Sequence, residues 1–148
     1  MQTFLPYPDF AQTFACLDSQ RLGKQRAEAL TILGILADLS GRKGWRRHPA
    51  VLMWGGYAPA LRHYLRLNIL EWLRRGFENN MVIPDSDPEK IRWPWWLGRE
   101  ELHRTHRAAL LRKDPSYYGK FGWKENPRLP YWWPTKNLQP LEALLPPA

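Results

Sequence analysis

One carboxylate stands among basic residues in the first long helix that the sequence predicts, over about residues 19–39. At 100° per residue, Arg21, Lys24, Gln25 and Glu28 fall on one side of this helix. A carboxylate beside a cationic intermediate can stabilise the developing charge and move protons. The same spacing also suits an ordinary surface pair between Lys24 and Glu28, worth about 0.2 to 0.5 kcal/mol. The pattern alone leaves both interpretations open.

Arg26 is unusual because its angle places it on the apolar side of the same helix, between Leu22 and Leu33. We expect it either to extend its guanidinium group to water or to reach a charged partner elsewhere in the fold.

A basic loop precedes the next predicted helix. Its cations and imidazole are Arg42, Lys43, Arg46, Arg47 and His48, and Pro49 follows at a position where helices tolerate proline. Backbone N–H groups at a helix N-terminus suit a phosphate. A solvated loop with no ligand explains the composition equally well.

His103 and His106 are spaced i, i+3 on a predicted helix. A metal site needs at least one more ligand, and no carboxylate stands at a recognised spacing. We therefore expect no metal and no cofactor, and place both histidines at the surface, in solvent or near phosphate.

Nucleophiles are few. Cys16 lies in an apolar setting typical of a core, and the motifs G-x-S-x-G, P-loop and G-x-G-x-x-G are absent, which disfavours α/β-hydrolase, nucleoside triphosphatase and dinucleotide chemistry. An amine remains open, because an α-amino group titrates near about 7.7 to 8.0 and is partly neutral at physiological pH.

Proline and glycine punctuation separates the elements that must position these residues. Asp9 and Asp18 are predicted N-caps, and Gly41 and Gly76 are predicted helix ends. Helices are expected over about 9–15, 19–39, 49–54, 59–75 and 99–113, with irregular structure over 77–98. From residue 116 onward we expect an extended chain, because six further prolines disfavour helix and central strand. The prediction is an all-α single domain over 1–148, whose Pro/Trp-rich extended C-terminal tail, about 124–148, wraps around it.

The composition of the chain indicates the class of its binding partner. The 148 residues include 22 Lys plus Arg against 14 Asp plus Glu, a net charge of +8, which favours a polyanion. Nine Trp and fourteen Pro are an unusual excess. The single cysteine excludes an intrachain disulfide and a four-cysteine zinc site. With no secretory pattern and no long apolar stretch, we expect a cytoplasmic protein with no membrane association.

Four blocks resemble the pyrimidine dimer DNA glycosylase family. The stretch LDSQRLGKQRAEAL (17–30) is similar to the family's L-D-x(5–6)-W-R-E-A-L segment. In the same order follow GWRRHPAVLMWGGY (44–57), LRRGFENN (73–80) and HRTHRAALLRKDPSYYGKFGW (103–123). The opening MQTFLP, together with LGKQR, is most similar to a bacterial branch of that family.

The resemblance implies a compact helical domain that repairs DNA. In the family the N-terminal α-amine attacks C1′ of the damaged nucleotide, the resulting imine permits β-elimination at the abasic site, and a glutamate assists. Glu28 aligns with that glutamate. Gln2 disfavours removal of Met1, so the implied nucleophile is the α-amine of Met1. Ala27 replaces an arginine of the family, which leaves the phosphate contact to Lys24 or Arg26.

The charge pattern and the resemblance together predict the contacts to damaged double-stranded DNA. The expected residues are Arg21, Lys24, Arg26, Arg46, Arg47, His48, Tyr117, Tyr118 and Lys120. Nucleoid association, no cofactor and no obligate protein partner are further expectations. The alternatives are a non-catalytic DNA-binding domain of the same fold, a monofunctional glycosylase for another lesion, and a Trp-rich scaffold that docks proteins.

Overall fold

The computed structural model describes residues 1–37 and 47–135, and this part of the chain contains helices and no strands. The α-helices are α1 (Phe10–Cys16), α2 (Ser19–Ala37), α3 (Pro49–Leu52), α4 (Ala58–Arg74), α5 (Glu100–Lys113) and α6 (Pro115–Tyr118). Short 3-10 helices span Pro88–Lys90 and Gly119–Phe121. The predicted all-α class is confirmed. No described helix is long and apolar enough to cross a membrane.

Local capping chemistry fixes the helix limits. Asp9 Oδ1 accepts a hydrogen bond from the Gln12 N–H at 2.9 Å, and Asp18 Oδ2 accepts one from the Arg21 N–H at 3.3 Å. Pro49 begins α3, and Gly76 follows α4 with a φ of +91°. The starts and ends predicted in the described part agree with these helices to within about two residues. Gly41 and the end of the predicted 19–39 helix lie outside the described residues.

The extended chain predicted from residue 116 onward was wrong over its first part. Asp114 Oδ1 accepts from the Tyr117 N–H at 3.2 Å and caps α6, in which Pro115 takes the first helical position. Proline is favoured there because no intrahelical bond needs its missing N–H. Residues 124–135 contain no helix, as expected for the tail, and residues 136–148 lie outside the described part.

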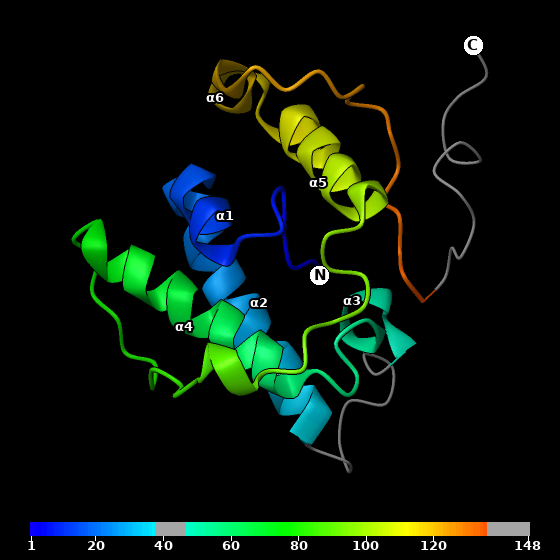
Figure 1. Cartoon of the computed structure of the whole chain (residues 1–148). Helices are drawn as coiled ribbons and strands as arrows, with labels where there is room; N and C mark the ends of the chain where they lie inside the picture. Colours follow the sequence, from blue (N-terminus) through cyan, green and yellow to red (C-terminus); the bar gives the residue numbers. More distant parts are fainter. Residues whose placement is uncertain (38–46, 136–148) are drawn as a thin grey trace.

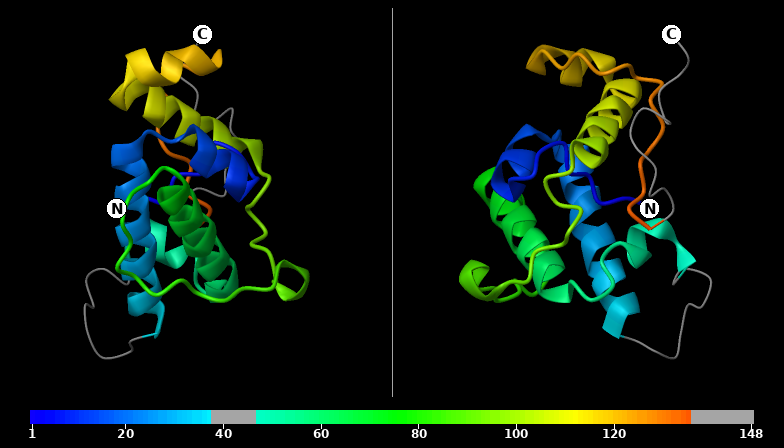
Figure 2. Two further views of the ribbon diagram at one scale, coloured as in Figure 1. Left: turned by 90° about the vertical axis from the view of Figure 1, so that its left-hand side faces the viewer. Right: turned by 45° about the vertical axis from the view of Figure 1, so that its right-hand side comes forward.

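Helices α2, α4 and α5 surround the start of the chain (Figure 1). The helices α1 and α2 pack against α4, and α5 lies on the opposite side of the N-terminal segment, residues 1–7 (Figure 1). In both views of Figure 2 α5 lies above α4, and α2 runs beside the first residues. The first residues therefore run through the middle of the molecule.

The three- and four-residue spacing of the apolar residues in α2 predicts a stripe of Leu22, Ala29, Leu30, Leu33, Leu36 and Ala37. The buried residues are instead Leu22, Gln25, Ala29, Ile32 and Ile35, and Leu30 is 45% exposed. The prediction was right for Leu22 and Ala29 and wrong for Leu30, and the polar Gln25 lies on the buried face. A buried amide needs hydrogen-bond partners, and the N-terminal segment provides one for Gln25.

Candidate active site

Side chains from α2, α4 and α5 hold the backbone of the N-terminal segment. The Phe4 N–H donates to Gln25 Oε1 at 2.8 Å, and the Tyr64 hydroxyl donates to the Phe4 carbonyl oxygen at 2.9 Å. The Leu5 N–H donates to His106 Nδ1 at 2.9 Å, and His103 Nδ1 donates to the Leu5 carbonyl oxygen at 2.8 Å. Each backbone polar group of two consecutive buried residues thus has a side-chain partner. We call these four side chains the N-terminal clamp.

The histidines of the clamp correct a prediction. His103 and His106 were expected at the surface, but both are fully buried. His103 Nε2 also accepts from the Gly98 N–H at 2.9 Å, which fixes its neutral form. Burial, and then the neighbouring His103, lowers the pKa of His106 to about 3. The signal available in the sequence was their i, i+3 spacing beside Leu102 and Leu110, which indicates a buried stripe as readily as a basic face.

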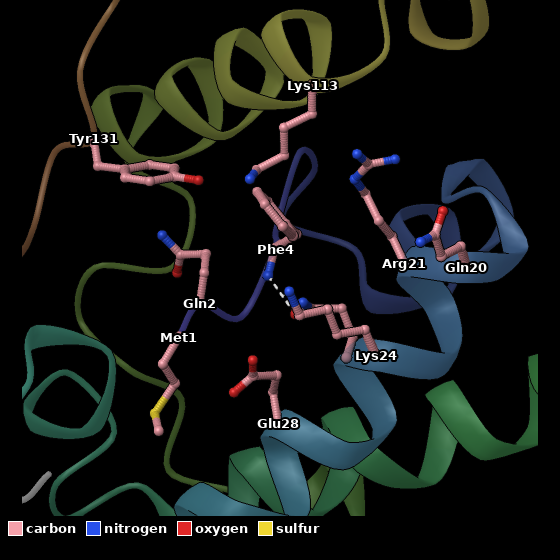
Figure 3. Close-up of a pocket in the computed structure, with 10 residues that line it drawn as sticks. Met1, Gln2, Phe4, Gln20, Arg21, Lys24, Glu28, Lys113 and Tyr131 are labelled. Atoms are coloured by element: carbon pink, nitrogen blue, oxygen red, sulfur yellow. Dashed lines mark hydrogen bonds between the residues drawn. The ribbon is translucent and has the colours of Figure 1, made fainter.

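The clamp holds the segment that places Met1 in the lining of a pocket of about 280 Å³ (Figure 3). The lining residues are Met1, Gln2, Phe4, Gln20, Arg21, Lys24, Gln25, Glu28, Lys113 and Tyr131. Most come from the N-terminal segment and from one side of α2, and Lys113 comes from the last turn of α5. The pocket therefore brings together both predicted catalytic residues, Met1 and Glu28, with the predicted DNA contacts Arg21 and Lys24.

Glu28 has no fixed partner. Among the described residues no hydrogen bond or ion pair involves its carboxylate, although Lys24 stands one turn away. The simple surface pair that the spacing allowed is therefore not formed. In Figure 3 the half-buried carboxylate points from α2 toward the start of the chain. Its charge also contributes, after burial, to the raised pKa of the Tyr64 phenol behind the pocket.

Arg21 is held at the rim by Asp18. The Arg21 Nη1 to Asp18 Oδ1 distance is 3.1 Å, and Asp18 also accepts a hydrogen bond from the Tyr118 hydroxyl. Burial alone would raise the pKa of Asp18, but the hydrogen bonds from Tyr118 and Arg21 lower it below its ordinary value. Asp18 stays ionised, and the Arg21 guanidinium is directed by this pair.

Lys24 and Lys113 have no acidic partner among the described residues. Partial burial, and then the charges of Arg21, Lys24 and Arg112, lowers the pKa of Lys113. Like charges gathered in this way repel one another unless an anion binds between them. The pocket is consequently cationic around a single carboxylate.

Two predicted DNA contacts have other roles in the structure. Tyr118 is fully buried, so its ring is not offered to DNA, and its hydroxyl instead positions Asp18. Arg26 lies outside the pocket, where Nη1 donates to Asn79 Oδ1 at 2.6 Å and the guanidinium stacks 4.7 Å from the Trp72 ring. The Arg26 guanidinium thus contacts a neutral amide and an aromatic ring rather than the charged partner that we considered. These contacts explain its place on the inner side of α2.

The remaining predicted contacts are separate from the pocket. Arg47 is exposed, and His48 caps α3 by accepting from the Ala50 N–H at 3.0 Å. Tyr117 is half-buried, with Lys120 Nζ 3.8 Å from the centre of its ring. Arg46 lies outside the described residues.

Sequence reasoning missed the clamp and one wall of the pocket. His103 and His106 were expected at the surface, and neither Lys113 nor Tyr131 was among the predicted site residues. The signal for Lys113 was its place in the last turn of a basic helix, where cations are also common for local reasons.

Comparison with known protein families gives a match over residues 1–85. The family model for pyrimidine dimer DNA glycosylase matches residues 1–85, which include Met1, Glu28 and the Gln25 and Tyr64 members of the clamp. No curated protein and no solved structure matched the chain. The match spans more than half of the sequence and contains both residues to which the resemblance assigned the chemistry. The chain therefore belongs to the pyrimidine dimer DNA glycosylase family.

Proposed function

We propose that this protein excises a damaged pyrimidine from duplex DNA and then cleaves the strand at the abasic site. The α-amine of Met1 is the nucleophile and Glu28 assists it. The observation that carries the proposal is that Met1 and the unpaired Glu28 carboxylate line one cationic pocket. The family match supports the glycosylase step, and the geometry supports the amine mechanism.

Base release begins when the neutral amine attacks C1′. The C1′–N1 bond breaks, and the base departs with the bonding electrons and takes up a proton. The nitrogen then loses one proton and its lone pair forms the C=N bond as the C1′–O4′ bond breaks, O4′ takes the bonding electrons and a proton, and a protonated imine remains at C1′. Glu28 stabilises the positive charge that develops on the sugar and the nitrogen, an effect that is strong in a partly desolvated pocket.

Strand cleavage uses the same imine. Removal of a C2′ proton, for which the Glu28 carboxylate is the available base, leaves an enamine that expels the 3′ phosphate by breaking the C3′–O bond. Water then hydrolyses the conjugated imine and frees the amine. The cations at the rim supply the attraction for the strand, and extrusion of the damaged nucleotide gives the amine access to C1′.

Replacing the carboxylate tests the assignment of Glu28. We expect Glu28→Gln to lower base release from a thymine-dimer duplex by at least about a hundredfold, because one preorganised charge at the reacting centre is worth 10²–10³ in rate. Binding to the same duplex should stay within a few-fold of the wild type. Glycosidic cleavage is measured in single turnover by gel analysis after alkaline cleavage of the resulting abasic site, because the detached thymine stays bonded to its neighbour through the cyclobutane ring, and binding is measured by fluorescence anisotropy.

Glu89→Gln is the matched control, because Glu89 is exposed on the Pro88–Lys90 helix and does not line the pocket. It should excise at the wild-type rate. Unchanged excision by Glu28→Gln would remove Glu28 from the mechanism. Full occupancy of damaged DNA by the wild type, with no product, would favour the non-catalytic alternative.

A further inference from the structure

The pocket has two chemically different ends. Glu28 lies at one end, on the middle of α2, and Lys113 reaches the pocket from the last turn of α5, at the opposite end (Figure 3). Arg21 and Lys24 stand between them along α2. The N-terminal segment passes under this arrangement and places Met1 next to Glu28. A sugar whose C1′ sits at the Met1 amine must therefore direct its phosphate away from Glu28, toward the cations.

The three cations at that end are not equivalent. Arg21 is already paired with Asp18 at 3.1 Å, so its charge is partly offset. Lys24 lies on the same helix as Glu28. Lys113 alone comes from a different helix and from the far side, and it has no hydrogen bond or ion pair among the described residues.

Its position is electrostatically unfavourable without a ligand. The side chain of Lys113 is exposed to solvent at the rim of the pocket, and the charges of Arg21, Lys24 and Arg112 act on it. A cation held among cations, with nothing negative of its own, is stabilised when an anion enters. The anion that the proposed reaction brings to the pocket, and on which negative charge grows during strand cleavage, is the 3′ phosphate.

We infer that Lys113 contacts the departing 3′ phosphate and serves the strand-cleavage step rather than base release. As the C3′–O bond breaks, its electron pair goes to the phosphate oxygen, which leaves as a phosphate monoester while the C2′ proton has passed to the base. The Lys113 ammonium group balances the charge that accumulates on that oxygen. This inference rests on the proposed function, since it requires the imine at C1′.

The test separates imine formation from strand cleavage on a duplex that carries a preformed abasic site. Borohydride trapping measures the imine, and gel analysis measures the nicked strand, both in single turnover. For Lys113→Met we expect trapping within about twofold of the wild type and nicking slowed at least about tenfold. Lys113→Arg keeps the charge and should nick within about threefold of the wild type.

Lys90→Met is the charge-matched control, because Lys90 is exposed on the Pro88–Lys90 helix outside the pocket. It should trap and nick like the wild type. Lys113→Gln provides a second neutral variant with a polar side chain, and thermal unfolding verifies that each variant folds.

The inference is overturned if the neutral variants nick at the wild-type rate, or if trapping and nicking fall in the same proportion, which would mean a role in binding alone. A wild-type protein that neither traps nor nicks would instead overturn the proposed lyase function, and the inference with it.

Discussion

The Gln25 side-chain oxygen is a buried acceptor in the middle of α2, and its partner is the Phe4 N–H at 2.8 Å. The Tyr64 hydroxyl lies 3.1 Å from the same oxygen. Burying a side-chain amide costs free energy unless its polar atoms have hydrogen-bond partners. Gln25 therefore occupies a core position as a polar residue because it holds the backbone that leads to Met1.

Replacing this amide by a hydrocarbon tests the clamp. We expect Gln25→Leu to lower the free energy of unfolding by about 1–3 kcal/mol, because the Phe4 N–H is left buried without a partner. Excision should fall as well, since Met1 is no longer held beside Glu28. Urea unfolding measures the first effect and a single-turnover excision assay the second. Gln12→Leu on the exposed side of α1 should change neither. A stable, fully active Gln25→Leu protein would show that the clamp does not position the amine.

At the scale of elements, α5 carries two buried histidines that face the N-terminal segment. His106 Nδ1 accepts the Leu5 N–H, which requires the ring to be neutral. Burial lowers the pKa of His106 from 6.5 to about 3, so the unfolded chain binds a proton more readily than the folded one. The resulting stability is fully present above about pH 6.5 and is lost as the pH falls toward 3.

We predict a matching loss of stability on acidification. Between pH 6.5 and pH 4 the free energy of unfolding should fall by up to about 1.4 kcal/mol per pH unit through His106, with a smaller contribution from His103, whose pKa burial also lowers. Urea unfolding at a series of pH values measures this slope. His106→Asn, which retains an acceptor but does not titrate, should show a shallower slope. An identical slope in the variant would assign the pH dependence to other groups.

Across the whole molecule, the helix limits follow from the local sequence. The site, in contrast, depends on contacts between distant parts of the chain. Asp9, Pro49 and Gly76 mark helix limits through their own backbones, so these limits could be read from the sequence. Glu28 and Lys24 share a helix face, which the helical period predicts. The clamp and Lys113 could not be predicted in this way, because the Leu5 backbone that His106 binds lies 101 residues away along the chain, and Lys113 reaches the pocket from a different helix than Glu28.

The same contrast applies to the aromatic residues. Trp54, Trp96 and Trp132 are fully buried, so much of the tryptophan excess fills the core, as their apolar area favours. Tyr118 was expected at DNA because the block that contains it resembles a segment that the family places against DNA. Tyr118 is buried because α6 turns back against the start of α2, where its hydroxyl group is hydrogen-bonded to Asp18.

The proposed mechanism requires the amine of Met1 to attack the sugar. Borohydride trapping on an abasic or thymine-dimer duplex, followed by protease digestion and mass spectrometry of the DNA-linked peptide, identifies the attacking nitrogen. We expect one reduced adduct, on the α-nitrogen of Met1, and its loss when that amine is acetylated. An adduct on a lysine such as Lys113, or no adduct from a protein that nicks the strand, would contradict it.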